Sequence, residues 1–262
     1  MSATETNAQD DTRLAPTVRV TLAKFDQSGN EPVYRSVREG VPIAEFVPLT
    51  ARDYVPRGLT PLRDATAQFI AHLDRLRLEE GVTIGLLIDE SGSMAENTES
   101  VIAGANEFVA GMAEVSGVDP KAAGTVLAVI VTDGLENASR ETSQQTLAKI
   151  VSEHEANGFT FIFLGANIDA WAQGSALGFS GRASGQVVNY VASPAGVVAA
   201  MRSVRSESAS YLADIAGYAA TRARSSRRSV SEDGVESLEN TGAAARGGGG
   251  RSEQAGGGPD GR

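Results

Sequence analysis

Cysteine is absent from this chain of 262 residues, which excludes disulfide bonds and thiolate metal sites. Long apolar runs are absent too: no stretch approaches the roughly 18 apolar residues of a membrane helix, and residues 1–16 lack an apolar signal core. Positive charge is scarce, and the net charge of −10 argues against general affinity for nucleic acid, because phosphate binding needs a cationic surface. We therefore expect a cytoplasmic protein that binds neither membranes nor nucleic acid.

The apolar content of 41% is enough for one substantial core plus a tail. Apolar runs predict strands near residues 17–25, 42–48, 82–88, 125–131 and 159–164, with a weaker one at 186–191. Between these runs, apolar residues such as Phe69 and Leu73 recur at helical spacing. The alternation predicts an α/β fold: a three-layer, doubly wound, mostly parallel sheet of the Rossmann-like type, with one antiparallel edge strand.

Composition divides the chain into four parts. Residues 1–15 are polar and are predicted to be disordered, whereas 16–192 carry the α/β pattern. Residues 193–220 predict an amphipathic helix whose narrow apolar seam packs either on its own domain or against a second copy or partner, so the oligomeric state stays open. Residues 221–262 are rich in Gly, Ser and Arg, contain few large apolar residues and are predicted to be disordered.

The apolar run 84–88 leads directly into a D-x-S-x-S pattern formed by Asp89, Ser91 and Ser93. Ligand sites of open α/β sheets lie on loops at the carboxyl ends of strands. One carboxylate and two hydroxyls on such a loop offer the oxygen ligands that a hard cation such as Mg²⁺ prefers. Asp and Ser after a strand also form turns and helix caps, so this pattern alone is weak.

Two further segments accompany the pattern. Residues 57–65 contain G-x-T-P-L-x-D-A, which predicts a helix with Thr60 at its cap and Pro61 at its first position. A second buried-strand run, 126–131, ends in Thr132-Asp133-Gly134. Three polar motifs at predicted strand and helix ends are more specific than one.

Together the three motifs resemble the metal-ion-dependent adhesion site of von Willebrand factor type A domains. Residues 136–139 and 163–170 are similar to a bacterial and phage branch of that family, and the resemblance covers roughly residues 17–180. It implies that a divalent cation is bound, directly or through water, by these side chains: Asp89, Ser91, Ser93, Thr60 and Asp133. Mg²⁺ is the expected ion, with Mn²⁺ and Ca²⁺ as alternatives.

Some of these residues have simpler alternative roles. Thr60 is either a metal ligand or a helix cap, and Asp133 is either a ligand or a turn former. Asn167 and Asp169 either frame the rim of the site or cap the following helix.

In chain order the sequence departs from the family, which places the D-x-S-x-S strand first. Here Thr60 precedes Asp89, residues 17–25 are similar to the family's second strand, and 41–48 to its short antiparallel edge strand. The unit spanning about 82–115 is thus predicted to have moved behind the helix that follows Thr60, which is an internal permutation. Its helix must now lead to the T-D-G strand. Either that helix changes its face of the sheet, or the crossover is left-handed, because right-handed crossovers prevail.

The favoured function is a cation-dependent protein-binding module that captures an Asp or Glu of an unidentified partner protein. One alternative is a vestigial metal site in a purely structural or interaction protein. A Mg²⁺-dependent phosphotransferase or hydrolase is less favoured, because the sequence has no P-loop, no G-x-S-x-G elbow and no base paired with Ser91 or Ser93. Both histidines, His72 and His154, lie on predicted amphipathic helices and are expected to be structural. We therefore expect no enzymatic activity.

Overall fold

The computed structural model describes residues 17–115, 117–166, 170–179, 186–217, 227–231 and 236–238. Its strands are β1 (Thr17–Phe25), β2 (Tyr34–Pro42), β3 (Gly81–Asp89), β4 (Thr125–Thr132), β5 (Phe159–Ala166), β6 (Gln186–Tyr190), β7 (Arg227–Val230) and β8 (Glu236–Leu238). Its α-helices are α1 (Leu62–Leu76), α2 (Thr98–Ala113), α3 (Gln144–Glu155), α4 (Ala170–Ala176) and α5 (Pro194–Ala213). Short 3₁₀ helices are η1 (Ile43–Glu45), η2 (Gly92–Asn97) and η3 (Pro120–Ala122).

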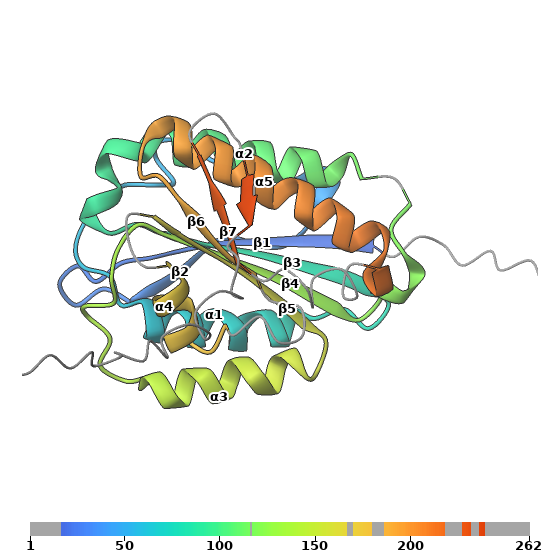
Figure 1. The fold of residues 1–262 in the computed structure, drawn as a ribbon, viewed down its shortest axis with the longest axis horizontal. Coiled ribbons are helices and arrows are strands. Elements are labelled where there is room, and N and C mark those ends of the chain that lie inside the picture. Colours follow the sequence, from blue (N-terminus) through green and yellow to red (C-terminus); the bar gives the residue numbers. More distant parts are fainter. Residues whose placement is uncertain are drawn as a thin grey trace, which may run out of the picture.

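The described strands form one sheet in the order β2-β1-β3-β4-β5-β6-β7-β8, and β1, β3, β4, β5, β6 and β7 run parallel. Helices α1, α3 and α4 cover one face of this sheet, and α2 and α5 cover the other (Figure 1). The predicted three-layer α/β fold with a mostly parallel sheet is confirmed. Strands β3 and β5 are buried along their whole length, which is why they read as continuous apolar runs.

The predicted edge strand at 42–48 is wrong in position. Strand β2 spans Tyr34–Pro42, pairs antiparallel with β1, and is followed by η1. This strand carries Arg35, Arg38 and Glu39, and none of its residues is fully buried, so a search for apolar runs passes over it. Pro42 has no N–H group to continue the ladder, which explains why the strand ends there.

The tail beyond 221 also differs from its prediction. Strand β7 pairs parallel with β6, and β8 returns antiparallel beside β7, so the far edge of the sheet carries a second antiparallel pair. The expectation of disorder is therefore wrong for these two strands. The prediction for residues 1–15, and that for the rest of 221–262 apart from Ser231, fall outside the described residues.

The crossovers that enter and leave β4 differ in hand. Strand β3 lies between β1 and β4. The connections β3-α2-β4 and β4-α3-β5 step the same way across the sheet, yet α2 and α3 lie on opposite faces (Figure 1). Two such connections must have opposite hands, so one of them is of the uncommon left-handed type.

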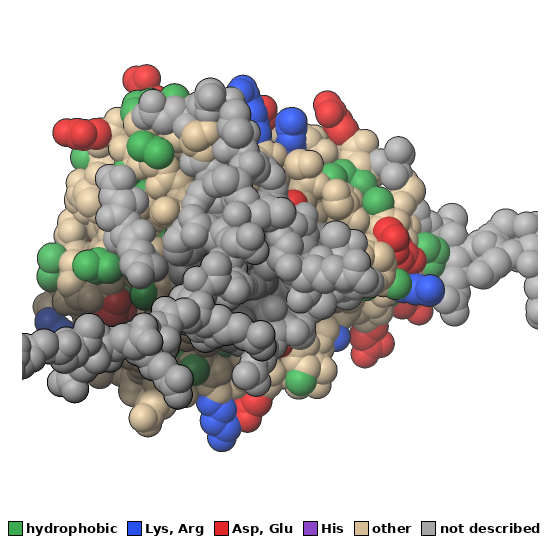
Figure 2. Space-filling view, viewed as in Figure 1, with side chains coloured by type: hydrophobic (Ala, Val, Ile, Leu, Met, Phe, Trp, Pro, Cys, Tyr) green, Lys and Arg blue, Asp and Glu red, His purple; other side chains and the backbone are tan. Residues whose placement is uncertain are grey.

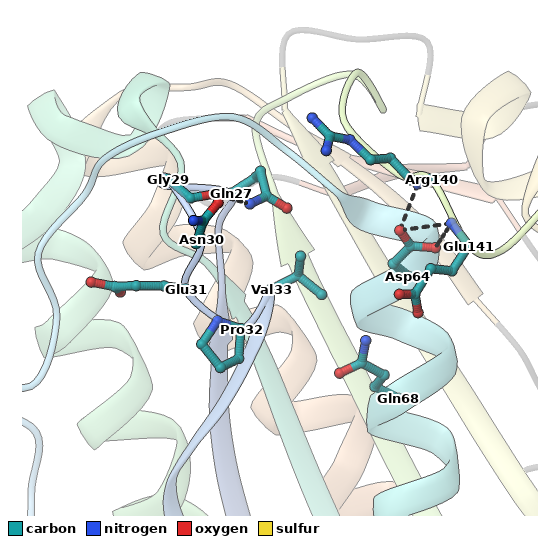
Figure 3. A pocket seen from close by; sticks show the side chains of 10 residues that line it. All are labelled: Gln27, Gly29, Asn30, Glu31, Pro32, Val33, Asp64, Gln68, Arg140 and Glu141. Carbon is teal, nitrogen blue, oxygen red and sulfur yellow. Dashed lines mark hydrogen bonds between the residues drawn. The ribbon is translucent and has the colours of Figure 1, made fainter.

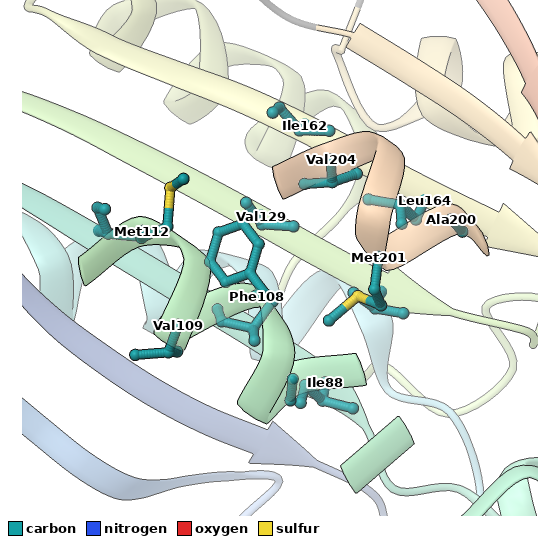
Figure 4. Packing of buried hydrophobic residues seen from close by; sticks show 14 of the residues in the cluster. Ile88, Phe108, Val109, Met112, Val129, Ile162, Leu164, Ala200, Met201 and Val204 are labelled. Carbon is teal, nitrogen blue, oxygen red and sulfur yellow. The ribbon is translucent and has the colours of Figure 1, made fainter. Parts of the chain in front are cut away.

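Helices α2 and α5 pack side by side and share a core with the sheet beneath them (Figure 4). The seam of α5 supplies Val197, Met201 and Val204 to this core. A Cβ at Gly104 of α2 would approach the Met201 side chain to 2.9 Å, so the glycine permits the close helix contact. Within the described residues, the seam therefore packs on its own domain. None of the helices in these residues combines the length and the hydropathy that a membrane span needs.

Candidate metal centre

The carboxyl ends of β3 and β4 bring two of the motifs together. Ile88 pairs with Val131 in the parallel register, so the next residues, Asp89 and Thr132, lie side by side. The Thr132 hydroxyl donates to Asp89 Oδ2 at 2.5 Å. Asp89 is fully buried, and its second oxygen, Oδ1, accepts the Ser91 N–H at 2.8 Å. Asp89 is thus oriented by contacts to both of its oxygens.

The two hydroxyls of the D-x-S-x-S loop extend this cluster toward the T-D-G loop. Ser91 Oγ lies 3.1 Å from Ser93 Oγ, and Ser93 Oγ donates to Asp133 Oδ1 at 2.5 Å. One chain of short contacts therefore connects four predicted ligands across two loops. Such a set of hydroxyl and carboxylate oxygens suits a hard divalent cation.

The fifth predicted ligand reaches the cluster on a loop held by backbone hydrogen bonds. Leu59 and Gln27 exchange two such bonds, of 2.9 and 3.1 Å, and Gly92 N donates to Gly58 O at 3.2 Å. Gly58 has a φ of +70°, and a Cβ there would lie 2.3 Å from the Gln27 carbonyl oxygen, so a side chain is excluded. This close approach positions the next residues, and hence Thr60, over the end of β3.

The contacts of Gly134 locate the Thr60 hydroxyl. A Cβ added to Gly134 would lie 2.7 Å from Thr60 Oγ1 and 3.5 Å from Asp89 Oδ2. The Thr60 hydroxyl and the Asp89 carboxylate therefore converge on the same point, beside the T-D-G loop. The structure brings together all five residues that the sequence predicts.

Thr60 does not cap α1, contrary to the predicted helix start. The helix begins at Leu62, one residue later than predicted, with Pro61 at its cap and no side-chain cap bond from that residue. Ser139 Oγ instead accepts the N–H groups of Arg63 and Asp64, at 3.1 Å each. The alternative role of Thr60 as a helix cap is therefore wrong, because another loop supplies the cap.

The electrostatics of the cluster favour a cation. Burial raises the pKa of Asp89 to about 7, although hydrogen bonds from Thr132 and Ser91 favour its ionised form. Burial also raises the pKa of Asp133. Neither carboxylate forms an ion pair with any Lys or Arg in the described part of the chain. A bound cation would supply the missing positive charge.

Sequence reasoning missed the buried charge network beside the site. Glu90, the variable residue of D-x-S-x-S, is fully buried and accepts from Lys24 at 2.8 Å and from Arg35 at 2.6 Å. Arg35 also pairs with the buried Asp26. No local pattern predicts these pairs, because the partners come from β1, β2 and the end of β3. The network ties the D-x-S-x-S loop to the β1–β2 hairpin.

Two further hydrogen bonds hold the D-x-S-x-S and T-D-G loops, and the sequence did not predict them. The buried Tyr54 hydroxyl donates to the Asp89 carbonyl oxygen at 2.6 Å. Gln173 of α4 donates from Nε2 to the Gly134 carbonyl oxygen at 3.2 Å. Asn167 and Asp169, proposed from sequence as rim residues, lie outside the described residues.

A pocket of about 380 Å³ lies next to the site, between the β1–β2 turn and the start of α1 (Figure 3). Asp64 lines it, but its carboxylate accepts the N–H groups of Arg140 at 2.7 Å, Thr142 at 2.6 Å and Glu141 at 3.2 Å. Burial opposes ionisation of Asp64, yet these donors together hold its pKa below the usual value. Asp64 is therefore an anchor for the loop after T-D-G.

The five predicted ligands offer both hydroxyl and carboxylate oxygens to a divalent cation. No group of three or more His, Cys, Asp or Glu side chains with metal-binding geometry occurs among the described residues. The cluster has two carboxylates and three hydroxyls, which is a low-charge site rather than an acidic cage. In comparisons with known proteins, no family model, no curated protein and no solved structure matches this chain.

Proposed function

We propose that this chain is a divalent-cation-dependent protein-binding module whose site is similar to the metal-ion-dependent adhesion site of von Willebrand factor type A domains. The residues that would hold the cation are Asp89, Ser91, Ser93, Thr60 and Asp133. The bound cation would attract a carboxylate of a partner protein, and that carboxylate would complete the coordination shell of the cation. The observation that carries the proposal is the convergence of these five side chains from three separate loops. Two carboxylates are among them, Asp89 fully buried and Asp133 partly buried, and neither has a basic partner in the described part of the chain.

The chemistry of the donors supports Mg²⁺ first, with Mn²⁺ and Ca²⁺ as alternatives. All five side chains offer oxygen, and the chain has no cysteine to favour softer metals. The three hydroxyls carry no formal charge, so a cation held here retains attraction for an incoming anion. This favours capture of a partner's Asp or Glu.

Thermal unfolding of the wild type and Asp89→Ala, each with millimolar Mg²⁺ or Mn²⁺ and then with chelator, tests cation binding. A cation at ten times its dissociation constant stabilises the fold by about 1.4 kcal/mol. For a domain of about 200 residues this raises the melting temperature by roughly 3–5 °C. We expect the shift in the wild type and not in Asp89→Ala.

Asp74→Ala is the matched control, because Asp74 is an exposed carboxylate near the other end of α1. It should keep the full response to Mg²⁺. No shift in the wild type at saturating metal would reject the proposal and favour a vestigial site in an interaction protein. Circular dichroism of Asp89→Ala in chelator separates loss of binding from loss of folding.

A further inference from the structure

Most of the exposed large apolar residues lie at the edge of the sheet that carries the candidate metal centre. Among the described residues, five large hydrophobic side chains are exposed: Val47, Val55, Leu59, Leu135 and Val191. Four of them lie at the edge of the sheet where the parallel strands end, and the exception is Val47, which lies beside β2. Hydrophobic side chains are visible at this edge, on the left of Figure 2, where Figure 1 shows the loops that follow the strands.

Two of these residues lie within two positions of predicted metal ligands. Leu59 precedes Thr60, and Leu135 follows Gly134, whose Cα borders the Thr60 hydroxyl. Leu59 is 52% exposed and Leu135 is 62% exposed, so neither contributes much to the core. Both leucines therefore lie, exposed, on the two loops that carry Thr60 and Asp133.

The backbone beneath both leucines is firmly held. Leu59 exchanges two backbone hydrogen bonds with Gln27. On the other loop, Gly134 N donates to Thr132 Oγ1 at 3.0 Å, and the Glu136 carboxylate accepts the N–H groups of Ala138 and Ser139. The loops thus present their leucines to solvent in fixed positions. Single exposed leucines are ordinary, but a fixed group around a polar centre is typical of a protein-binding surface.

A third exposed residue, Val55, is held close to the D-x-S-x-S loop, and with Leu59 and Leu135 it forms what we call the apolar rim. The Val55 N–H donates to the buried Glu90 carboxylate at 2.6 Å, which holds this residue beside the loop. Apolar side chains around a central polar contact exclude water from it and strengthen it. A fully hydrated, highly acidic segment would leave these side chains without partners.

We propose that this surface recognises a protein segment in which the metal-seeking Asp or Glu is flanked by large aliphatic or aromatic residues. The proposal rests on the cation-dependent function above and adds the nature of the partner. The cation binds the carboxylate, and the apolar rim of Val55, Leu59 and Leu135 contacts the neighbouring apolar side chains of the segment. Apolar flanks then give selectivity that the carboxylate alone cannot give.

Selection from a random peptide display library tests this, with the full purified chain as bait in Mg²⁺ and, in parallel, in chelator. We expect Mg²⁺-dependent peptides that contain Asp or Glu with Leu, Ile, Val or Phe at adjacent positions. Leu59→Asn combined with Leu135→Asn should bind a selected peptide at least about tenfold more weakly, which is about 1.4 kcal/mol. Val47→Asn is the matched control, because Val47 is 61% exposed yet away from this edge, and it should bind normally.

The Mg²⁺-dependent rise in melting temperature, measured on the same double variant, separates the two proposals. If the rise persists while peptide binding is lost, both the metal site and the apolar rim are supported. Selected peptides without apolar flanks, no Mg²⁺-dependent peptides despite a normal thermal shift, or full binding by the double variant would each overturn the apolar-rim proposal. Absence of the thermal shift in the wild type would instead reject the metal site itself.

Discussion

Replacing Gly134 with Ala should move one metal ligand while leaving the fold intact. The added Cβ would lie 2.7 Å from Thr60 Oγ1, whereas ordinary contacts begin near 3.4 Å. The Thr60 side chain is buried and β-branched, so it has few other rotamers to adopt. We expect its hydroxyl to retreat by about 0.7 Å, the difference between those two distances.

This displacement is large compared with what a cation tolerates. Mg²⁺ requires oxygen ligands near 2.0–2.1 Å in near-octahedral geometry. Disturbing the groups around a metal typically lowers its affinity about 10-fold to 100-fold. At a Mg²⁺ concentration ten times the wild-type dissociation constant, a tenfold loss reduces the stabilisation from about 1.4 to about 0.4 kcal/mol. The thermal shift should fall from roughly 3–5 °C to about 1 °C.

Titration of Mg²⁺ against melting temperature measures this directly, and Gly92→Ala provides the matched control. A Cβ at Gly92, on the D-x-S-x-S loop, would meet only the Gly58 carbonyl oxygen at 3.5 Å, which is an ordinary contact. Gly92→Ala should therefore keep the wild-type dissociation constant. If Gly134→Ala also keeps it, the Thr60 hydroxyl does not help to bind the cation, and the reasoning from its position fails.

In chelator at pH 8, Asp89→Asn should be more stable than the wild type by up to about 4 kcal/mol. The pKa of Asp89 is raised from 3.8 to about 7, so its contribution to stability is full below pH 3.8 and is lost as the pH rises through 7. A melting-temperature series from pH 3 to pH 8 checks this, and a pH-independent difference would contradict it. Asp64→Ala should lower the unfolding free energy by about 2–4 kcal/mol in urea titrations, because three N–H groups of the loop 140–142 lose their acceptor; an unchanged midpoint would mean that the loop does not depend on this anchor. Truncation after Ala220 should lower the melting temperature, because it removes β7 and exposes the edge of β6; an unchanged value would show that β7 adds no stability.

The local pattern of apolar residues was sufficient to predict most strands of the central sheet. The runs at 82–88, 125–131 and 159–164 are almost continuously apolar, because both faces of a central parallel strand are covered. Each run corresponds to an observed strand. The edge strand β2 was misplaced because its residues are charged and only partly buried. Its position depends on the hairpin with β1 and on the ion pairs of Arg35, which a single stretch of sequence does not reveal.

Sequence by itself determined which residues stand at the ends of the strands, because apolar runs define the strands and the polar motifs follow them. The polar motifs, taken with their resemblance to the adhesion site, predicted as ligands Asp89, Ser91, Ser93, Thr60 and Asp133. Tertiary structure alone decided that Thr60 turns its hydroxyl to Asp89 instead of capping α1, through the close backbone approach at Gly58. It also decided the hand of the crossovers and the burial of Glu90 among basic side chains. These features join residues tens of positions apart, and steric fit and ion pairing at that separation have no counterpart in local periodicity.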